Sequence, residues 1–213
     1  MDATEVTTRR RLLAAARELT ERSGYGAASV QAIAATAGLA TGTLYRHFPS
    51  KAELLVELFR EVCDREVRAW MVADADAAES SQVERLRWVV RTFAERALSN
   101  RRLAWALIAE PVDPLVDVER LAYRAHYARL LAAGLRQAIA AGEVPHQDVE
   151  LVAAAIVGGV GEALVGPLSP LAGSGGVDDA AVVDAIGEFA VRAVGGDRAA
   201  PFGSSADLDL RSG

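Results

Sequence analysis

The stretch Ala40-Thr-Gly-Thr-Leu-Tyr-Arg-His-Phe-Pro-Ser-Lys51 mixes chemistries that a plain core helix would not contain. Leu44 and Phe48 are four residues apart, so they can anchor one face of a helix to a core. Hydroxyl groups, a phenol and positive charges occupy the positions around them. Gly42 has no side chain, which lets a partner approach the backbone closely. The stretch therefore predicts a short helix that is anchored on one side and presents polar groups on the other.

Two further helices are expected before this stretch. Thr7 or Thr8 can cap the first, and its inner face repeats at helical spacing through Leu12, Ala15, Ala16 and Leu19. Gly24 ends that helix, Ser29 caps the second and Gly38 ends the second. Two helices joined by a short Gly-containing turn are typical of a helix-turn-helix motif, in which the second member reads the partner.

A long helix is expected directly after the stretch. Pro49 cannot continue the preceding helix, because it lacks an N–H group and clashes with the preceding turn. Ser50-Lys-Ala-Glu53 forms a capping box for a helix over residues 51–73. Lys51 stands at its N-terminus, where an ammonium and free N–H groups can together hold a phosphate. This helix starts beside the presented surface and runs into the rest of the chain.

The charge of the chain is distributed unevenly. Residues 1–51 contain seven basic and four acidic residues, a net charge of +3, while the whole chain carries −6. The remainder therefore carries −9, and a basic head on an acidic body is typical of a DNA reader with a second module. Arg9, Arg10 and Arg11 lie at the helix end that the dipole makes unfavourable for cations. Phosphate contact and simple solvation explain them about equally well.

The remaining bulk properties favour a soluble helical protein. The chain is 51% hydrophobic, rich in Ala, and only 6% aromatic. Cys63 is the single cysteine, so a reducing compartment fits and an intramolecular disulfide is impossible. No signal-peptide pattern opens the sequence, and the apolar run over residues 151–161 is too short to span a bilayer. We expect a cytoplasmic protein without a membrane partner.

The residues from Ser29 to Leu55, Ser-Val-Gln-Ala-Ile-Ala-Ala-Thr-Ala-Gly-Leu-Ala-Thr-Gly-Thr-Leu-Tyr-Arg-His-Phe-Pro-Ser-Lys-Ala-Glu-Leu-Leu, resemble the DNA-binding signature of the TetR family of bacterial transcriptional regulators. The resemblance covers roughly residues 8–58. It implies a homodimer whose two heads enter successive major grooves of double-stranded operator DNA. It further implies that Gln31, Thr41, Thr43 and Arg46 face bases or phosphates, that Gly42 permits close approach to the groove, and that Tyr45, His47 and Lys51 hold phosphates.

The chain departs from the family pattern at Ala40, where a capping hydroxyl is usual. Loss of a cap costs about 0.5–2 kcal/mol. Thr41 could cap the helix instead, and its role as a base reader would then change. Arg46 is the strongest candidate, because Arg bidentate to guanine is the commonest specific base contact. Tyr45 could alternatively pack in the core of the head, and His47 could be a structural histidine. No ligand spacing supports a metal site.

The body is expected to be helical throughout, so the fold class is all-α. The predicted domains are a helix-turn-helix DNA-binding domain (residues 1–50), a helical ligand-binding and dimerisation domain (51–195), and a disordered tail (196–213). Apolar periodicity and breakers place further helices over residues 82–98, 101–110, 117–141, from about 148 to 166, and 180–194, and an acidic loop over 74–81.

Several body residues are candidates for binding a ligand. Aromatic side chains with polar handles can line a cavity in an otherwise Ala/Leu-rich body, although core packing explains most of them equally well. Two carboxylates next to apolar runs could be buried acids, or only a helix cap and an exposed group. The candidates are Trp70, Trp88, Phe93, Trp105, Glu110, Tyr123, His126, Tyr127 and Glu162.

The helix ending near Gly166 is apolar nearly all round, so it must be buried on more than one side. Its glycines lower helix stability by up to about 1 kcal/mol each, which is reasonable where another helix approaches closely. Together with the last helix it predicts an isologous dimer interface, although packing within one subunit is the alternative. The interface candidates are Val152, Ile156, Gly159, Val160, Ile186, Phe189 and Ala190.

No catalytic constellation is recognisable. The glycines over residues 158–166 lack the Lys-Ser/Thr of a phosphate loop, and Cys63 has no evident base partner. We therefore expect no enzymatic activity, no cofactor and no metal. The sequence predicts a repressor released from a near-palindromic operator by a small, largely apolar effector. An activator and a helical small-molecule carrier are the alternatives.

Overall fold

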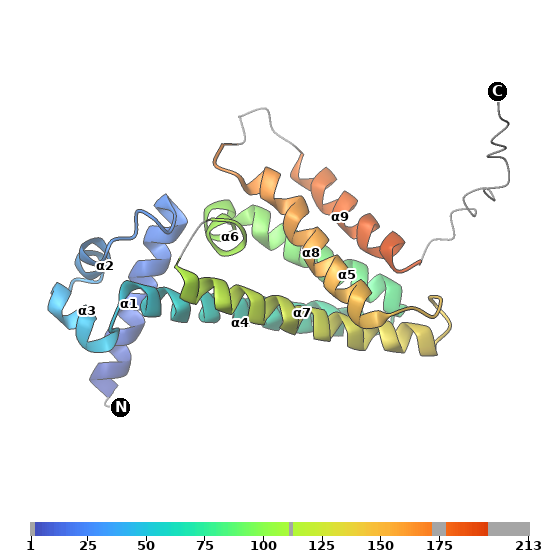
Figure 1. The fold of residues 1–213 in the computed structure, drawn as a ribbon, viewed down its shortest axis with the longest axis horizontal. Coiled ribbons are helices and arrows are strands. Elements are labelled where there is room, and N and C mark those ends of the chain that lie inside the picture. Colours follow the sequence, from blue (N-terminus) through green and yellow to red (C-terminus); the bar gives the residue numbers. More distant parts are fainter. Residues whose placement is uncertain (1–2, 111–112, 172–177, 196–213) are drawn as a thin grey trace, which may run out of the picture.

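A computed structural model of the protein describes residues 3–110, 113–171 and 178–195, which form nine helices and no strand. The all-α prediction is confirmed. The helices are α1 (Ala3–Ser23), α2 (Val30–Thr36), α3 (Thr41–His47), α4 (Lys51–Asp76), α5 (Gln82–Ser99), α6 (Arg101–Ile108), α7 (Pro114–Ala140), α8 (Val149–Leu168) and α9 (Asp179–Ala193). The first three gather at one end as a small head, α4 and α7 run lengthwise through the body, and α5, α8 and α9 complete it (Figure 1).

Local capping explains most helix starts. The Ser29 hydroxyl accepts a hydrogen bond from the Ala32 N–H group, and the Ser50 hydroxyl accepts one from the Glu53 N–H group, as predicted. Ala40 is the N-cap of α3 and supplies no side-chain bond, so Thr41 is the first helical residue and does not take over the cap. The role predicted for Thr41 as a base reader is therefore not changed by capping and stays a prediction.

Two helix starts were predicted wrongly. The first helix begins at Ala3, not after Thr7 or Thr8, because nothing in the preceding residues stops a helix. The helix predicted from residue 117 begins at Pro114, where the Asp113 side chain accepts from the Leu115 N–H group. Proline suits the first helical turn because its missing N–H group would be unpaired there in any case. The predicted tail, residues 196–213, lies outside the described residues.

The core of the head continues into α4 and touches the body. Leu12, Ile33, Leu44 and Phe48 are fully buried in one cluster with the inner face of α4. Leu103 of α6 and Val116 of α7 are buried in the same cluster. The predicted domain boundary at residue 50 therefore lies inside a continuous core and stays a prediction. A displacement of α4, α6 or α7 should therefore also displace the head, because packed cores transmit displacement.

The second apolar cluster occupies the middle of the body. Residues of α5, α7, α8 and α9 form it, with Ala153 and Leu164 of α8 completely buried. Helix α8 has 20 residues, and by length and composition it is long and apolar enough to cross a membrane. The apolar run over residues 151–161, which alone is too short to span a bilayer, is only part of this helix. The core helix of a soluble protein passes the same test, and the inner face of α8 is core.

Candidate functional site

Helix α3 has one buried and one presented face. Leu44 and Phe48 are 0% and 1% exposed, whereas Tyr45 is 52% exposed. Arg46 is also exposed, and its Nη2 donates to the Thr43 hydroxyl at 3.2 Å, which fixes the direction of the guanidinium. Of the other predicted contact residues, Gln31 and Gly42 are exposed, and Thr41, Thr43 and His47 are partly exposed. The structure thus gathers a polar surface on one side of the head.

Two of the three consecutive arginines, residues 9–11, bind to the helix-turn-helix itself. Arg9 pairs with Glu57 of α4, donates to the His47 carbonyl at 2.8 Å, and lies 4.2 Å from the centre of the Phe48 ring. Arg11 donates to the Ala37 carbonyl at the end of α2. Arg10 is exposed. Phosphate contact by the whole triplet is therefore unnecessary to explain it, because Arg9 and Arg11 position the helix-turn-helix.

The Lys51 ammonium is held inside the head. It donates to the Tyr25 carbonyl at 3.2 Å and lies 4.7 Å from the Tyr25 ring centre. The pKa of Lys51 lies below its usual value, because the lowering by burial exceeds the raising by the nearby Glu110 carboxylate. The ammonium has three N–H donors, so a phosphate contact, which stays a prediction for Lys51, would use those that Tyr25 does not accept.

Glu110, a predicted ligand residue, instead joins the body to the head. Its two carboxylate oxygens accept hydrogen bonds from the Tyr25 N–H group at 3.1 Å and from the Gly26 N–H group at 3.2 Å. These groups lie in the turn between α1 and α2, which Gly24 opens with a φ of +82°. Glu110 follows the end of α6, so its side chain points toward the head. Its assignment to a ligand site is corrected accordingly.

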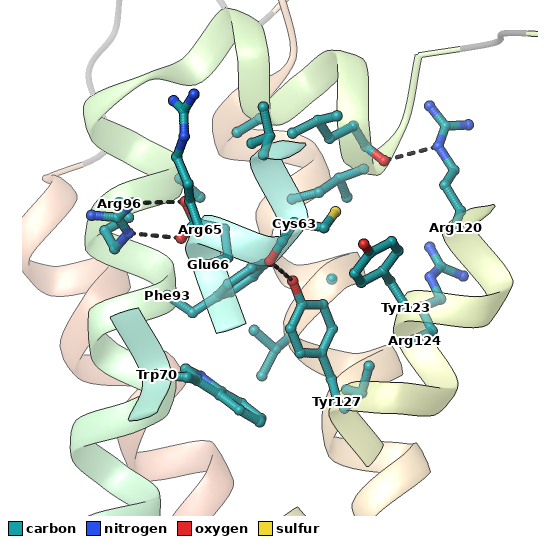
Figure 2. A pocket seen from close by; sticks show the side chains of 18 of the residues that line it. Cys63, Arg65, Glu66, Trp70, Phe93, Arg96, Arg120, Tyr123, Arg124 and Tyr127 are labelled. Atoms are coloured by element: carbon teal, nitrogen blue, oxygen red, sulfur yellow. Dashed lines mark hydrogen bonds and ion pairs between the residues drawn. The ribbon is translucent and has the colours of Figure 1, made fainter. Parts of the chain in front are cut away.

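A cavity of about 270 Å³ lies between α4, α5, α6, α7 and α8. Four of the predicted ligand residues line it: Trp70, Phe93, Tyr123 and Tyr127 (Figure 2). Their polar atoms already have partners, since Trp70 donates to the Val89 carbonyl at 3.1 Å and Tyr123 to the Asp64 carboxylate at 2.7 Å. The Tyr127 hydroxyl faces the Cys63 carbonyl at 3.4 Å, and burial raises the pKa of the Tyr127 phenol.

The other predicted ligand residues lie outside the cavity wall. Trp88 is 54% exposed on α5, and Glu162 is exposed on α8, because both occupy outward positions of their helices. Trp105 packs against the body cluster from α6. His126 lies beside the Tyr127 ring, with 6.5 Å between ring centres, but does not line the cavity. Residue type alone did not distinguish the two faces of each helix.

Most of the predicted interface residues belong to the subunit's own core. Ile156, Val160, Ile186 and Ala190 are at most 5% exposed within a single chain, and Ile156 and Val160 also line the cavity. Val152 is partly buried against the same cluster. The four buried side chains face the core of their own subunit, because the sequence of an all-apolar helix does not show which stripe faces inward. A role of Val152, Gly159 and Phe189 in an interface stays a prediction.

Gly159 and Phe189 explain each other within one chain. A Cβ atom added to Gly159 would lie 2.8 Å from Cζ of Phe189, so the glycine makes room for this ring. Phe189 itself is 43% exposed. By contrast, Gly158 is exposed, and a Cβ atom added to it would meet nothing within 4 Å. Among the described residues, the face of α8 around Gly158 is therefore open.

Sequence reasoning missed the charged part of the cavity wall. Arg17, Arg65, Arg96, Arg120 and Arg124 line the cavity together with one carboxylate, Glu66. The spacing of Arg120, Tyr123, Arg124 and Tyr127 at one face of α7 was the available signal. Burial raises the pKa of the lining Cys63 thiol to about 12.

Comparison with known proteins places the head in a family. Residues 12–58 match the family described as "Bacterial regulatory proteins, tetR family". The chain is similar to the HTH-type transcriptional repressor KstR of Rhodococcus jostii (strain RHA1), with 44% identity over 57 residues, which are 27% of each protein. The chain thus matches about a quarter of the length of this relative.

The fold is similar to those of two proteins of known structure that are both named FadR. The fatty acid degradation regulator FadR from Bacillus halodurans superimposes with a TM-score of 0.73 at 23% identity, over 86% of this chain and 94% of that one. The transcriptional regulator FadR from Bacillus subtilis, in complex with stearoyl-CoA, superimposes with a TM-score of 0.70 at 23% identity, over 88% and 98%. At this identity the likeness concerns the fold.

Proposed function

Since the head of this chain belongs to the tetR family of bacterial regulatory proteins, we propose that the protein is a ligand-responsive DNA-binding transcriptional regulator. The presented face of α3 carries the proposal: Arg46 is exposed and oriented by Thr43, on a helix anchored through Leu44 and Phe48. An oriented guanidinium on a short helix suits the major groove, where Arg pairs with guanine. Gln31, Thr41, Gly42, Tyr45 and His47 extend this surface.

Repression is the proposed mode of action. A relative that is similar in the head is named a transcriptional repressor, and one structural neighbour was solved with stearoyl-CoA. In this chain a small, largely apolar effector enters the cavity beside Trp70, Phe93 and Tyr127 and releases the operator. Activation is the alternative mode. The proposed setting is the cytoplasm, with no enzymatic role.

A homodimer is proposed because a near-palindromic operator needs two heads, about 34–36 Å apart. The outward face of α8 supplies the surface: Leu151 is 67% exposed, and Ala154, Ala155 and Gly158 are exposed beside it. Phe189 of α9 adds an exposed ring. This face replaces the inward residues predicted from sequence. It is largely apolar, and the added Cβ of Gly158 would meet no atom of the described residues, so the same patch of a second subunit could pack on it as an isologous contact.

Effector binding reaches the head through the end of α6. Arg120 lines the cavity and donates to the carbonyls of Ala106, Leu107 and Glu110 at 2.7–2.8 Å. Glu110 in turn holds the N–H groups of Tyr25 and Gly26. A ligand that displaces Arg120 or the α6 end therefore shifts the turn before α2. A coupling free energy of about 1–3 kcal/mol would change operator affinity about five- to 150-fold.

The test is a gel-shift assay with the DNA that flanks the protein's own gene. The parent protein is expected to shift this DNA in the presence of excess nonspecific competitor at moderate salt. Arg46→Ala is expected to abolish the specific shift, whereas Arg68→Ala, which removes an exposed arginine from α4, leaves it intact. Equal shifts for both variants would argue against the assigned reading face.

A small-molecule carrier with an inactive head is the second candidate, favoured only by the cavity. It predicts ligand binding without any sequence-specific DNA shift, so the same assay separates the two functions.

A further inference from the structure

The charge of the cavity wall is one-sided. Five arginines and one carboxylate line it, while the remaining lining residues are uncharged. Figure 2 shows Arg65 and Arg96 on one side of the aromatic interior and Arg120 and Arg124 on the other. Such a wall attracts an anionic group only where an arginine is not already paired with a carboxylate.

Four of these arginines are already engaged. Arg96 binds both oxygens of Glu66, at 2.7 and 2.8 Å, and Arg17 binds Glu21 at 2.7 Å. Arg65 pairs with Glu61, and Arg120 binds three backbone carbonyls and Asp117. These side chains neutralise their partners or hold the α6 end, so they are committed to the structure.

Arg124 differs from the other four. It is exposed, and no hydrogen bond or ion pair joins it to any residue within the described ranges. Its helical neighbours at three and four positions, Arg120, Leu121, Tyr127 and Ala128, contain no carboxylate that could pair with it. The next residue on its inward side, Tyr123, lines the cavity. An exposed, unpaired guanidinium thus lines a cavity whose interior is largely apolar.

A ligand in the cavity does not have to form hydrogen bonds with the aromatic residues of its wall. The polar atoms of Trp70, Tyr123 and Tyr127 face protein acceptors, so an apolar group can enter without leaving them unpaired. The volume of about 270 Å³ corresponds to about nine waters at about 30 Å³ each. An acyl chain of medium length suits this space, whereas a long chain or a large head group must extend outside.

We propose that the effector is an amphipathic anion whose apolar chain fills the cavity and whose carboxylate or phosphate pairs with Arg124. The word effector rests on the proposed function, since it assumes that the ligand controls DNA binding. The binding site itself follows from the cavity, the aromatic interior and the unpaired guanidinium. Arg binds carboxylate and phosphate with the same two-pronged geometry, so both head groups are compatible with the site.

Isothermal titration calorimetry on the full chain tests the site with four probes that share an eight-carbon chain. Octanoate carries a carboxylate, octanoyl-CoA carries phosphates, octanol is neutral and octylamine is cationic. One or both anions are expected to bind more tightly than octanol, and octylamine most weakly. The stronger anion identifies the head group as a carboxylate or as a phosphate. Octanol or octylamine binding as tightly as the better anion would overturn the proposal, as would no binding of either anion.

Arg124→Gln is the decisive variant, and Arg129→Gln is its matched control, because Arg129 is exposed on the same helix but does not line the cavity. Arg124→Gln is expected to weaken the better anion roughly tenfold or more and to leave octanol unchanged. Equal affinities for both variants would contradict the assignment. A gel shift of the ligand-free parent protein separates the anion site from the proposed DNA-binding function. Operator binding without anion binding refutes only the anion site. Anion binding without operator binding refutes only the proposed function as a DNA-binding regulator.

Discussion

Removal of the Glu110 carboxylate should loosen the connection between body and head. The carboxylate accepts two backbone hydrogen bonds, from Tyr25 at 3.1 Å and from Gly26 at 3.2 Å. Hydrogen bonds to charged groups contribute about 1.5–3 kcal/mol each when well shielded, but this site is partly exposed. We therefore expect Glu110→Ala to cost about 1–2 kcal/mol in total. If the turn must be fixed for operator binding, affinity falls roughly five- to 30-fold.

The assay is fluorescence anisotropy with a labelled operator fragment, combined with thermal unfolding of the same samples. Glu110→Gln keeps one acceptor oxygen and should fall between the parent and Glu110→Ala. Glu79→Ala is the control, because Glu79 is exposed in the turn after α4 and its loss changes the net charge equally. The midpoint of unfolding should drop by roughly 2–8 °C in Glu110→Ala.

Coupling gives a second readout that a simple loss of stability would not change. An effector that acts through the α6 end should alter operator affinity less in Glu110→Ala than in the parent, whereas its own affinity for the cavity stays nearly constant. The reasoning is refuted if Glu110→Ala binds operator as tightly as Glu79→Ala and retains the full effector response.

Three further predictions concern single positions. Gly158→Leu should weaken the homodimer in analytical ultracentrifugation without unfolding the subunit, because an added Cβ meets nothing in its own chain; an unchanged dimer would exclude this face as the interface. Ala40→Ser should supply the missing cap of α3 and raise the free energy of unfolding by about 0.5–2 kcal/mol in denaturant titrations; an unchanged free energy would contradict the absence of a cap. Cys63 should react with a thiol reagent at pH 8 about a thousandfold more slowly than in the unfolded chain, because burial raises its pKa from 9.0 to about 12. Its reactive thiolate form becomes populated only as the pH approaches that value, and rapid labelling of the native protein at pH 8 would contradict the prediction.

The head was predictable because its signals are local. The spacing of Leu44 and Phe48 determined which side of α3 is buried, and the hydroxyls of Ser29 and Ser50 marked two helix starts. These features depend on residues within one or two turns of each other. The exposed position of Arg46 followed from the same periodicity. The contacts that these residues make with DNA stay predictions.

The body was less predictable because its contacts join residues far apart in the chain. Nothing near Glu110 indicates that its carboxylate lies against Tyr25, 85 residues earlier. Helix α8 is apolar on nearly every side, so the inward position of Ile156 and the outward position of Gly158 depend on where α5, α7 and α9 pack. In the cavity wall, the Arg96–Glu66 pair and the bonds of Arg120 to the end of α6 likewise join different helices. Arg124 stands out only after these partners are known.

Footprinting of the operator tests the central claim most directly. The ligand-free protein at physiological salt should protect two half-sites related by an approximate twofold axis, with centres one helical turn apart, and Arg46→Ala should lose both protections together. Uniform protection of any DNA, or protection that Arg46→Ala retains in full, would contradict the account of this chain as a sequence-specific regulator that reads DNA through α3.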